Sequence, residues 1–455
     1  MRNKNKIIIL WIIAIFLPLF TLRLFQDEML YMILSTKAFH LNFAPRSSLV
    51  FILTSPFASI ENVDIRVFFL RALTAFITLL DLILIYELAK ERFDKKSAFL
   101  GTVTFLFSFV TLRYGARYTL EPWGVFFVLL ALYLLERKPL LSAISLGLAF
   151  TARETWLTTY PFFLLYVWRA KRGRAFWKFV TSSTIPVVLN FLFIYSISIT
   201  RSPLGYNARI ISNWIIIELL KLDISAWVQF FIAYPLTVLG FIYAVYSLKN
   251  REEPLLVALP SVLTLNVVFG FLLNGPFERY TFGPLALMSV YSGYGLVELY
   301  KKMSNKVIIV RKINIEKGIA LFLVIQIIVL NLAVLQFSDI GAKGIQDYGY
   351  WYDQRVFSIL EEYGHQNESF GGTPHPGMLG FKNWTWADRR IEFVLNMSPD
   401  WLITFRSWVK IDRKAVESGA IQIWTSGPYV VIHAQEKDAI ERYVFPANFT
   451  LWRHP

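Results

Sequence analysis

The chain has 455 residues, of which 55% are hydrophobic and 17% aromatic, while only 17% are charged. Soluble domains carry about 25% charged residues, so this composition indicates a protein that lives in a bilayer. Apolar runs long enough to cross a hydrocarbon core of about 30 Å recur along the chain, which predicts a polytopic α-helical membrane protein. The chain has no cysteine, so disulfides and thiolate metal sites are excluded.

The formal net charge of +14 is concentrated in short loops between the apolar runs. Cytoplasmic loops of membrane proteins collect Lys and Arg in this manner, so the charge reflects topology and contact with anionic headgroups. Nucleic acid is therefore excluded as the partner that this basicity serves. The basic loops are "KERFDKK" (90–96), "ERK" (136–138), "RAKRGR" (169–174) and "KKMSNK" (301–306).

The apolar runs predict about eleven transmembrane helices, and the basic loops set their direction. The N-terminus, "MRNKNK", is expected in the cytoplasm and the C-terminal region outside the cell membrane. The first apolar segment starts at Ile7 and lacks a small-residue cleavage site, so we expect a retained helix and not a signal peptide. The predicted spans are 7–25, 66–89, 97–113, 122–136, 140–154, 156–169, 179–199, 226–248, 254–273, 281–300 and 318–337.

Residues 338–455 differ from the transmembrane domain predicted over 1–337. Their apolar runs shrink to strand length, as in "DWLITF" (400–405) and "PYVVIHA" (428–434), whereas "VFSILEEYG" (356–364) is typical of a helix that stops at glycine. The pattern predicts a small extracytoplasmic α/β domain.

Asparagine sequons support the same topology. Residues 338–455 contain Asn367, Asn383, Asn396 and Asn448, and each of these stands in an Asn-X-Ser/Thr sequence. A lone sequon means little, but all four lie in the segment that the charge bias places outside.

Acid–base groups mark the loops that this topology places on the outer side. Interfacial arginines and tyrosines are often only headgroup contacts, and that interpretation applies to each residue singly. Taken together, the groups run against the positive-inside trend, which favours a functional set. The set comprises Asp27 and Glu28 after the first span, Arg113, Arg117 and Glu121 after the third, Arg153 and Glu154 after the fifth, and Glu278, Arg279 and Tyr280 after the ninth.

Carboxylates and arginines at a membrane surface suit a reaction that activates a hydroxyl while a phosphate leaves. The carboxylate accepts the proton of the hydroxyl. The guanidinium groups neutralise the charge that develops on the phosphate, most effectively where the dielectric is low. The headgroup of an isoprenoid phospho-sugar would lie at this surface.

Residues 27–169 resemble the GT-C superfamily of polyprenyl-phosphate-sugar glycosyltransferases, in the branch of the protein O-mannosyltransferases and the lipid A aminoarabinose transferase. The order and spacing of four motifs carry the resemblance. They are "DE" followed by Tyr31, the segment 71–122 ending in "RYTLEP", the run "GLAFTARETWLTTYPFFLLYVWR" (147–169), and "ERYTFGPLALMSVYSGYGL" (278–296).

The resemblance implies a role for each residue that matches a family motif. Asp27 matches the first-loop aspartate proposed as general base, with Glu28 as its neighbour. Arg117 and Glu121 match the pair near the sugar and the acceptor. Arg153 stands where the family usually has a lysine near the lipid phosphate, and Arg279 and Tyr280 match its Arg-Tyr pair.

Departures from the family pattern leave parts of this assignment open. The first loop has "FAPRSSL" (43–49) where the family often has His-Pro-Pro-Leu, which puts acceptor contacts there in doubt. Lone interfacial histidines such as His40 are more often surface residues than metal ligands, so no metal ligand is predicted and a divalent metal stays an unsupported alternative. Asp81, in the middle of a span, must face protein or water, and we expect it in a structural helix–helix hydrogen bond.

The expected function is transfer of a hexose, such as mannose, from a polyprenyl (dolichyl) phosphate donor to a protein, lipid or glycan acceptor at the outer face. A single displacement would invert the anomeric carbon. Two alternatives come from other classes. A secondary transporter would hold its ionisable groups near the midplane on broken helices, and a non-catalytic receptor would use only the outer domain.

Overall fold

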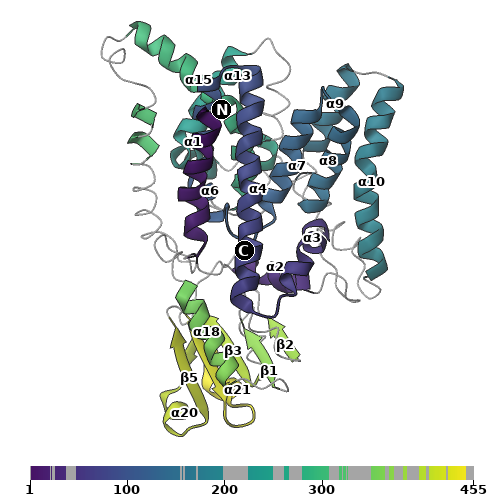
Figure 1. Cartoon of the computed structure of the whole chain (residues 1–455). Coiled ribbons are helices and arrows are strands. Elements are labelled where there is room, and N and C mark those ends of the chain that lie inside the picture. The colour runs from purple at the N-terminus through teal and green to yellow at the C-terminus, as the bar shows by residue number, and fades with distance from the viewer. Residues whose placement is uncertain are drawn as a thin grey trace. The chain divides into compact units, whose positions relative to one another are not determined.

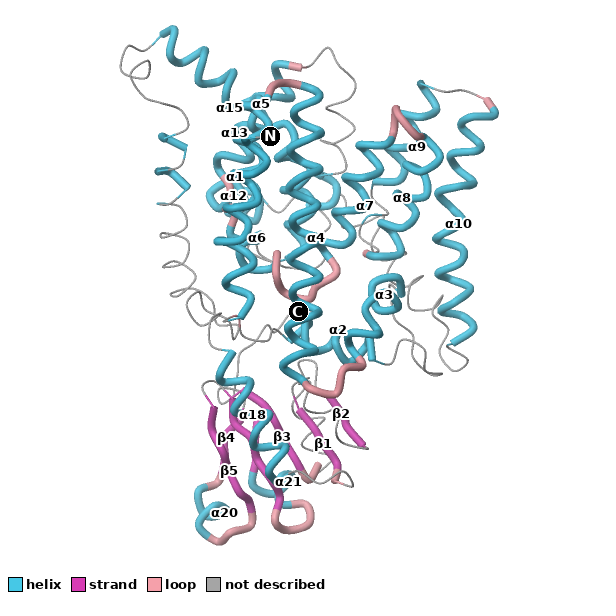
Figure 2. The backbone as a smooth tube through the Cα atoms, in the orientation of Figure 1, coloured by secondary structure: helices cyan, strands magenta, loops and turns pink. Residues whose placement is uncertain are grey.

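The computed structural model divides into two compact units. A helical unit comprises Met1–Leu19, Leu34–Ser59 and Phe69–Leu332, and a mixed unit comprises Phe20–Ile33, Ile60–Phe68 and Ala333–Pro455. The strands, magenta in Figure 2, belong to the mixed unit. The structure describes residues 2–20, 22, 26–36, 48–153, 156, 159–170, 173–197, 224–248, 261–265, 279–306, 317–319, 321–323, 325, 350–363, 368–372, 383–386, 399–405, 409–426 and 429–446.

Long apolar segments form the helices of the helical unit (Figure 1). Prolines in the first turn of α7, α8 and α13 mark where these helices start, because proline is favoured there, where its missing N–H is not needed. The elements are α1 (Arg2–Trp11), η1 (Ile12–Phe16), η2 (Leu17–Phe20), α3 (Ser48–Ala58), α5 (Lys95–Leu106), α6 (Phe109–Tyr114), α7 (Glu121–Leu134), α8 (Pro139–Ala152), α9 (Tyr160–Ala170), α10 (Arg174–Ile197), α12 (Ile224–Ala233), α13 (Pro235–Ser247), η5 (Arg279–Thr281) and α15 (Phe282–Lys306). Two helices have residues in both units, α2 (Gln26–Thr36) and α4 (Val63–Arg92).

Within the described residues, two continuous helical segments are long and apolar enough to cross a membrane. They are Asn3–Phe20 and Val63–Arg92, and the pair Ala226–Ala233 and Pro235–Ser247 would add a third span that is bent by 101°. Shorter apolar helices include α7 and α8, at 14 residues each. The count of eleven spans therefore stays a prediction, and most of 254–273 and 318–337 lies outside the described residues.

The span predicted over 97–113 is broken. Helix α5 ends at Leu106 and α6 starts at Phe109, because the side chain of Ser108 accepts a hydrogen bond from the amide of Thr111 and caps a new helix. A run of apolar residues hides such a break, since hydropathy alone cannot distinguish one helix from two.

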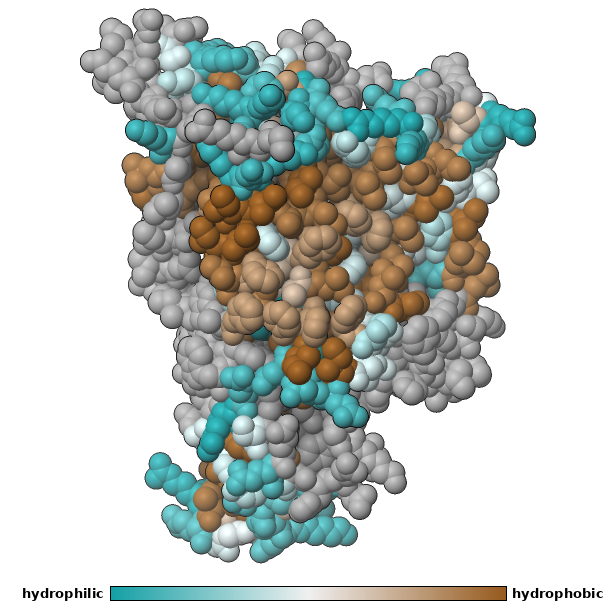
Figure 3. All heavy atoms as spheres, viewed as in Figure 1, coloured by the Kyte–Doolittle hydropathy of each residue, from teal (hydrophilic) through white to brown (hydrophobic). Residues whose placement is uncertain are grey.

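Close helix packing joins α5, α13 and α15. A Cβ atom on Gly293 of α15 would collide with the carbonyl oxygen of Ser97 on α5, so only glycine allows this approach. Small residues serve the same purpose between transmembrane helices in general. On the surface of the unit, Ile9, Leu189 and Ile232 are exposed, and Figure 3 shows a broad hydrophobic band with hydrophilic residues gathered at its upper end.

A mixed five-stranded sheet with strand order β2-β1-β3-β6-β5 forms the centre of the mixed unit. Strands β1, β2 and β3 are parallel, while β6 runs antiparallel to both β3 and β5. The predicted strands at 400–405 and 428–434 correspond to β3 and β6, and the predicted helix to α18. The elements are α18 (Tyr350–Tyr363), β1 (Ser369–Gly372), β2 (Asn383–Trp386), β3 (Trp401–Phe405), β4 (Val409–Ile411), α20 (Arg413–Glu417), β5 (Ile421–Ser426), β6 (Tyr429–Ala434), α21 (Ala439–Tyr443) and β7 (Val444–Pro446).

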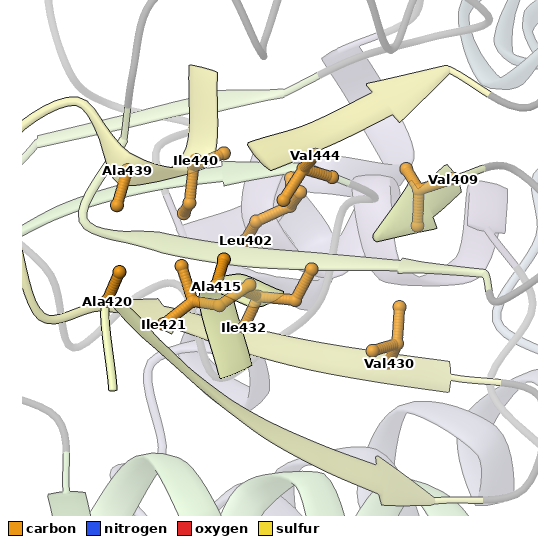
Figure 4. Packing of buried hydrophobic residues seen from close by; sticks show 10 residues of the cluster. All are labelled: Leu402, Val409, Ala415, Ala420, Ile421, Val430, Ile432, Ala439, Ile440 and Val444. Atoms are coloured by element: carbon orange, nitrogen blue, oxygen red, sulfur yellow. The ribbon is translucent and has the colours of Figure 1, made fainter. Parts of the chain in front are cut away.

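Both faces of this sheet are covered. One face carries a cluster that includes Leu402 and Ile432, which pack on the short helices α20 and α21 (Figure 4). On the other face, Tyr363 at the end of α18 contacts the ring of Trp424, with 5.1 Å between ring centroids. The alternation of buried side chains along the strands thus produces a three-layer α/β unit.

Candidate active site

Three charged side chains from different helix ends meet inside the helical unit. Glu121 is the first residue of α7, Arg153 follows the last residue of α8, and Arg279 begins η5, directly before α15. Oε1 of Glu121 lies 3.2 Å from Nη2 of Arg153 and 3.2 Å from Nε of Arg279. All three residues are buried, with 4%, 5% and 7% of their surfaces exposed. We call these residues the Glu121 cluster.

Tyr280 joins the two arginines of the cluster. Its hydroxyl accepts a hydrogen bond of 2.9 Å from Nη2 of Arg279. Its ring lies 5.0 Å from Cζ of Arg153 and 4.7 Å from Cζ of Arg279. Because a guanidinium group packs favourably on an aromatic ring, Tyr280 helps to hold both cations in one place.

A small pocket borders the cluster. Its lining residues are Glu121, Arg153, Trp156, Thr264, Tyr280, Gly283 and Pro284. One cation, Arg153, lines this pocket together with the carboxylate of Glu121 and the residues Thr264 and Tyr280, and Trp156 forms a large aromatic wall.

Two glycines allow Trp156 to line the pocket. A Cβ atom on Gly283 of α15 would lie 2.5 Å from Cζ2 and Cη2 of the indole, and one on Gly124 of α7 would collide with its Nε1. The ring therefore fits between α7 and α15 only because both positions lack a side chain. Trp156 is 4% exposed, so it is held firmly.

Arg117 lies in the loop between α6 and α7, four residues before Glu121. It is 1% exposed and so is no headgroup contact. The amide of Thr119 donates to the carbonyl oxygen of Arg117 at 2.7 Å, which closes a tight turn around Tyr118. This turn, over residues 115–120, leads directly into α7.

Other predicted site residues belong to the mixed unit or lie outside the described residues. Asp27 and Glu28 lie on the part of α2 that belongs to the mixed unit, and Glu28 is fully buried. Nothing is described for the side chain of Asp27 or for Glu154, Glu278 and His40. In the described residues, no group of three or more His, Cys, Asp or Glu side chains is placed to hold a metal ion.

Asp81 differs from the sequence-based expectation. It is fully buried in α4, so it faces protein as predicted. In the described part of the chain, however, neither of its carboxylate oxygens has a hydrogen-bond partner. The prediction that Asp81 forms a helix–helix hydrogen bond is therefore wrong within the described part of the chain.

The arrangement is suited to binding an anion. The guanidinium group of Arg153 lines the pocket, and that of Arg279 lies against the same oxygen of Glu121. Both arginines are buried, and such donors stabilise phosphate charge best in a low dielectric. Sequence motifs identified Glu121, Arg153, Arg279 and Tyr280, all of which come together. They missed Trp156, Thr264 and the two glycines, although "TARETW", "EPWG" and "TFGP" contain three of these four.

Comparison with known proteins finds similarity in structure alone. No protein-family model and no curated protein sequence matches the chain. ArnT from Cupriavidus metallidurans in the apo state has a TM-score of 0.59 at 10% identity, over 94% of this chain and 96% of that one. The same protein bound to undecaprenyl phosphate scores 0.51 at 10% identity, over 94% and 97%.

An oligosaccharyltransferase shows the same likeness. The enzyme from Archaeoglobus fulgidus, in complex with zinc and sulfate, has a TM-score of 0.52 at 12% identity, over 89% of this chain and 68% of that one. ArnT and the oligosaccharyltransferase are both GT-C glycosyltransferases. This chain therefore shares the fold of these two proteins, as the GT-C resemblance of the sequence motifs led us to expect, and it has a strand-containing C-terminal region.

Proposed function

We propose that this protein is a membrane glycosyltransferase that moves a sugar from a polyprenyl-phosphate donor to a protein, lipid or glycan acceptor. The observation that carries the proposal is the buried Glu121 cluster beside a small pocket in a GT-C fold. The structure of ArnT with undecaprenyl phosphate supports this donor class. The sugar follows only from the sequence resemblance, which suggests a hexose such as mannose.

The cluster would hold the donor phosphate. Arg153 and Arg279 present N–H donors that match phosphate oxygens, and Glu121 keeps both guanidinium groups in fixed positions. When the bond from the anomeric carbon to the phosphate oxygen breaks, its electron pair stays on that oxygen. The arginines stabilise this growing charge, and fixed donors of this kind need no reorganisation during the reaction.

The acceptor would be activated by Asp27. This carboxylate takes the proton of an acceptor hydroxyl while the hydroxyl oxygen forms its bond to the anomeric carbon. The choice of Asp27 follows from the sequence resemblance, and its neighbour Glu28 has no exposed surface. One displacement of this kind inverts the anomeric carbon and releases polyprenyl phosphate.

A transfer assay tests the proposal. Purified protein in lipid nanodiscs would be incubated with radiolabelled polyprenyl-phospho-sugars and a membrane extract as the source of acceptor. We expect incorporation of label, and a loss of about 10²–10⁴-fold in Asp27→Asn, since a positioned base contributes about that much. Failure of every donor to label an acceptor would contradict the proposed function, whereas full activity of Asp27→Asn would contradict only the base.

The proposed orientation places the N-terminus in the cytoplasm and residues 338–455 outside the cell membrane. The native chain has no cysteine, so one introduced at the exposed Glu436, in the turn after β6, can be labelled selectively. Labelling by a membrane-impermeant reagent in intact cells is expected. Labelling only after permeabilisation would reverse the orientation.

A further inference from the structure

Three hydroxyl groups meet in the interior of the helical unit, beside the turn that carries Arg117. The hydroxyl of Tyr118 lies 2.6 Å from Oγ of Ser35, near the end of α2, and 2.5 Å from Oγ1 of Thr54 on α3. Tyr118, Ser35 and Thr54 have no exposed surface. The tyrosine is therefore the point where the turn is attached to both helices.

The bonds of this cluster fit the donors and acceptors available. Thr54 donates to the carbonyl oxygen of Val50 at 2.7 Å, which leaves its own oxygen to accept from Tyr118. Burial raises the pKa of Tyr118 to about 12, although its bonds with Ser35 and Thr54 lower it. The phenol thus keeps its proton at any working pH and serves as an anchor, not as an acid or base.

The turn is held at its other end as well. Oγ1 of Thr78 on α4 donates to the carbonyl oxygen of Gly115 at 2.7 Å. Residues 115–120 are therefore tied to α4 at their start and to α2 and α3 near their end. Arg117 lies between the two ties, and Glu121 follows directly after the second.

We propose that Tyr118 is a positioning residue for the transfer reaction: its hydroxyl fixes the turn that sets Arg117 and the first residue of α7, Glu121. The inference rests on the proposed function of the Glu121 cluster. It adds a residue that touches neither donor nor acceptor and that couples α2 and α3 to the cluster through the turn. A displacement of about 1 Å at a catalytic group can cost 10²-fold in rate, so such an anchor matters for turnover.

The test is Tyr118→Phe, which removes one oxygen atom and keeps the ring. Hydrogen–deuterium exchange of the amides over 115–121 should become at least about tenfold faster. The kcat for transfer should fall about tenfold or more while the KM for the donor stays within twofold. The matched control is Tyr160→Phe, which removes a hydroxyl that bonds Oγ of Ser183 at 2.8 Å, between α9 and α10. It should change neither exchange over 115–121 nor kcat.

A second variant tests the same hydrogen bond from its other side. Thr54→Val removes a partner of the same hydroxyl, so its effect and that of Tyr118→Phe should not add in the double variant. Unchanged exchange over 115–121 in Tyr118→Phe, or an unchanged kcat, would overturn the inference. The exchange measurement needs no substrate, so it tests whether Tyr118 anchors the turn even if the wild-type protein shows no transfer activity. A lack of transfer activity in the wild type would contradict the proposed function and leave the exchange result unaffected.

Discussion

Two buried carboxylates in the helical unit, Glu121 and Asp81, have very different surroundings. Glu121 lies at the start of α7, between two arginines, and lines a small pocket. Asp81 lies in the middle of α4, fully buried, with no hydrogen-bond partner for its oxygens in the described part of the chain. Both pay the cost of removing a carboxyl group from water, but only Glu121 recovers part of it through charged partners.

The presence of charged partners distinguishes the candidate site at Glu121 from the single buried carboxyl group of Asp81. A buried carboxylate that fixes two cations can shape a binding pocket, because each charge depends on the others for its position. A buried carboxyl group without such partners gives nothing with which to orient a substrate. Residue type and burial are alike in the two cases, so the partners decide which one is functional.

The largest expected effect is on transfer. Glu121→Gln replaces the carboxylate by an amide that cannot hold two guanidinium groups in the same way, so we expect turnover to fall about 10²–10³-fold, as for a lost oxyanion donor. Asp81→Asn, which also removes one buried carboxyl group, should keep turnover within about threefold. Radiolabel transfer measures the turnover of both variants, and equal losses would contradict a functional role of Glu121 that Asp81 does not share.

The free energy of unfolding should also respond differently to substitution of Glu121 and of Asp81. Glu121→Leu leaves two buried arginines without their carboxylate, which costs about 3–5 kcal/mol of unfolding free energy. Asp81→Leu is expected to be neutral or stabilising, because an apolar side chain of similar size needs no partner. Thermal unfolding in detergent compares the variants. A strong loss in Asp81→Leu would mean that Asp81 has a stabilising contact.

A smaller loss of stability is expected from a change at Gly283, which packs against the indole of Trp156 in the pocket wall. Gly283→Ala places a methyl group 2.5 Å from the indole of Trp156, and overpacking of this kind costs about 1–3 kcal/mol. Donor affinity should fall as well, since the ring must move into or away from the pocket. Adding Trp156→Phe should restore part of the stability, and a double variant no better than Gly283→Ala would show that the indole is not the obstacle.

The smallest expected effect concerns a third carboxylate, Asp94, which lies at the surface. Asp94 caps α5 by accepting from the amides of Lys96 at 2.7 Å and Ser97 at 3.0 Å. Partial burial alone would raise the pKa of Asp94, but the hydrogen bonds from Ser97 and Lys96 outweigh it and lower the pKa. We expect Asp94→Ala to cost about 1 kcal/mol.

The pH dependence of this cap follows from the direction of the shift. A carboxyl group with a lowered pKa stabilises the fold above its ordinary pKa of about 3.9, and this contribution is lost as pH falls through the lower folded-state value. The difference in unfolding free energy between wild type and Asp94→Ala should therefore be constant near neutral pH and shrink only below about pH 4. A difference that already shrinks between pH 6 and 8 would contradict the assignment.

Sequence motifs predicted much of the site, because short local patterns carry it. Glu121, Arg153 and Arg279 each stand at a helix end, and Glu121 and Arg279 are followed directly by proline and tyrosine in the sequence. The contact of Trp156 with Gly124 and Gly283 could not be predicted, since it depends on how α7 and α15 pack. For the same reason the sequence suggested a hydrogen bond for Asp81 that the described residues do not form.

The central claim is that the Glu121 cluster binds the phosphate of a polyprenyl donor. The most direct measurement compares binding of undecaprenyl phosphate and of undecaprenol, which lacks the phosphate, to wild type, Arg153→Gln and Arg279→Gln in nanodiscs. Arg113→Gln is the matched control, because the family resemblance implies no role for Arg113, which packs on the rings of Phe109 and Tyr114 at 5.7 and 5.3 Å. We expect wild type and Arg113→Gln to prefer the phosphate form by at least about tenfold and the other two variants to lose this preference. Equal preference in all four proteins would contradict the central claim.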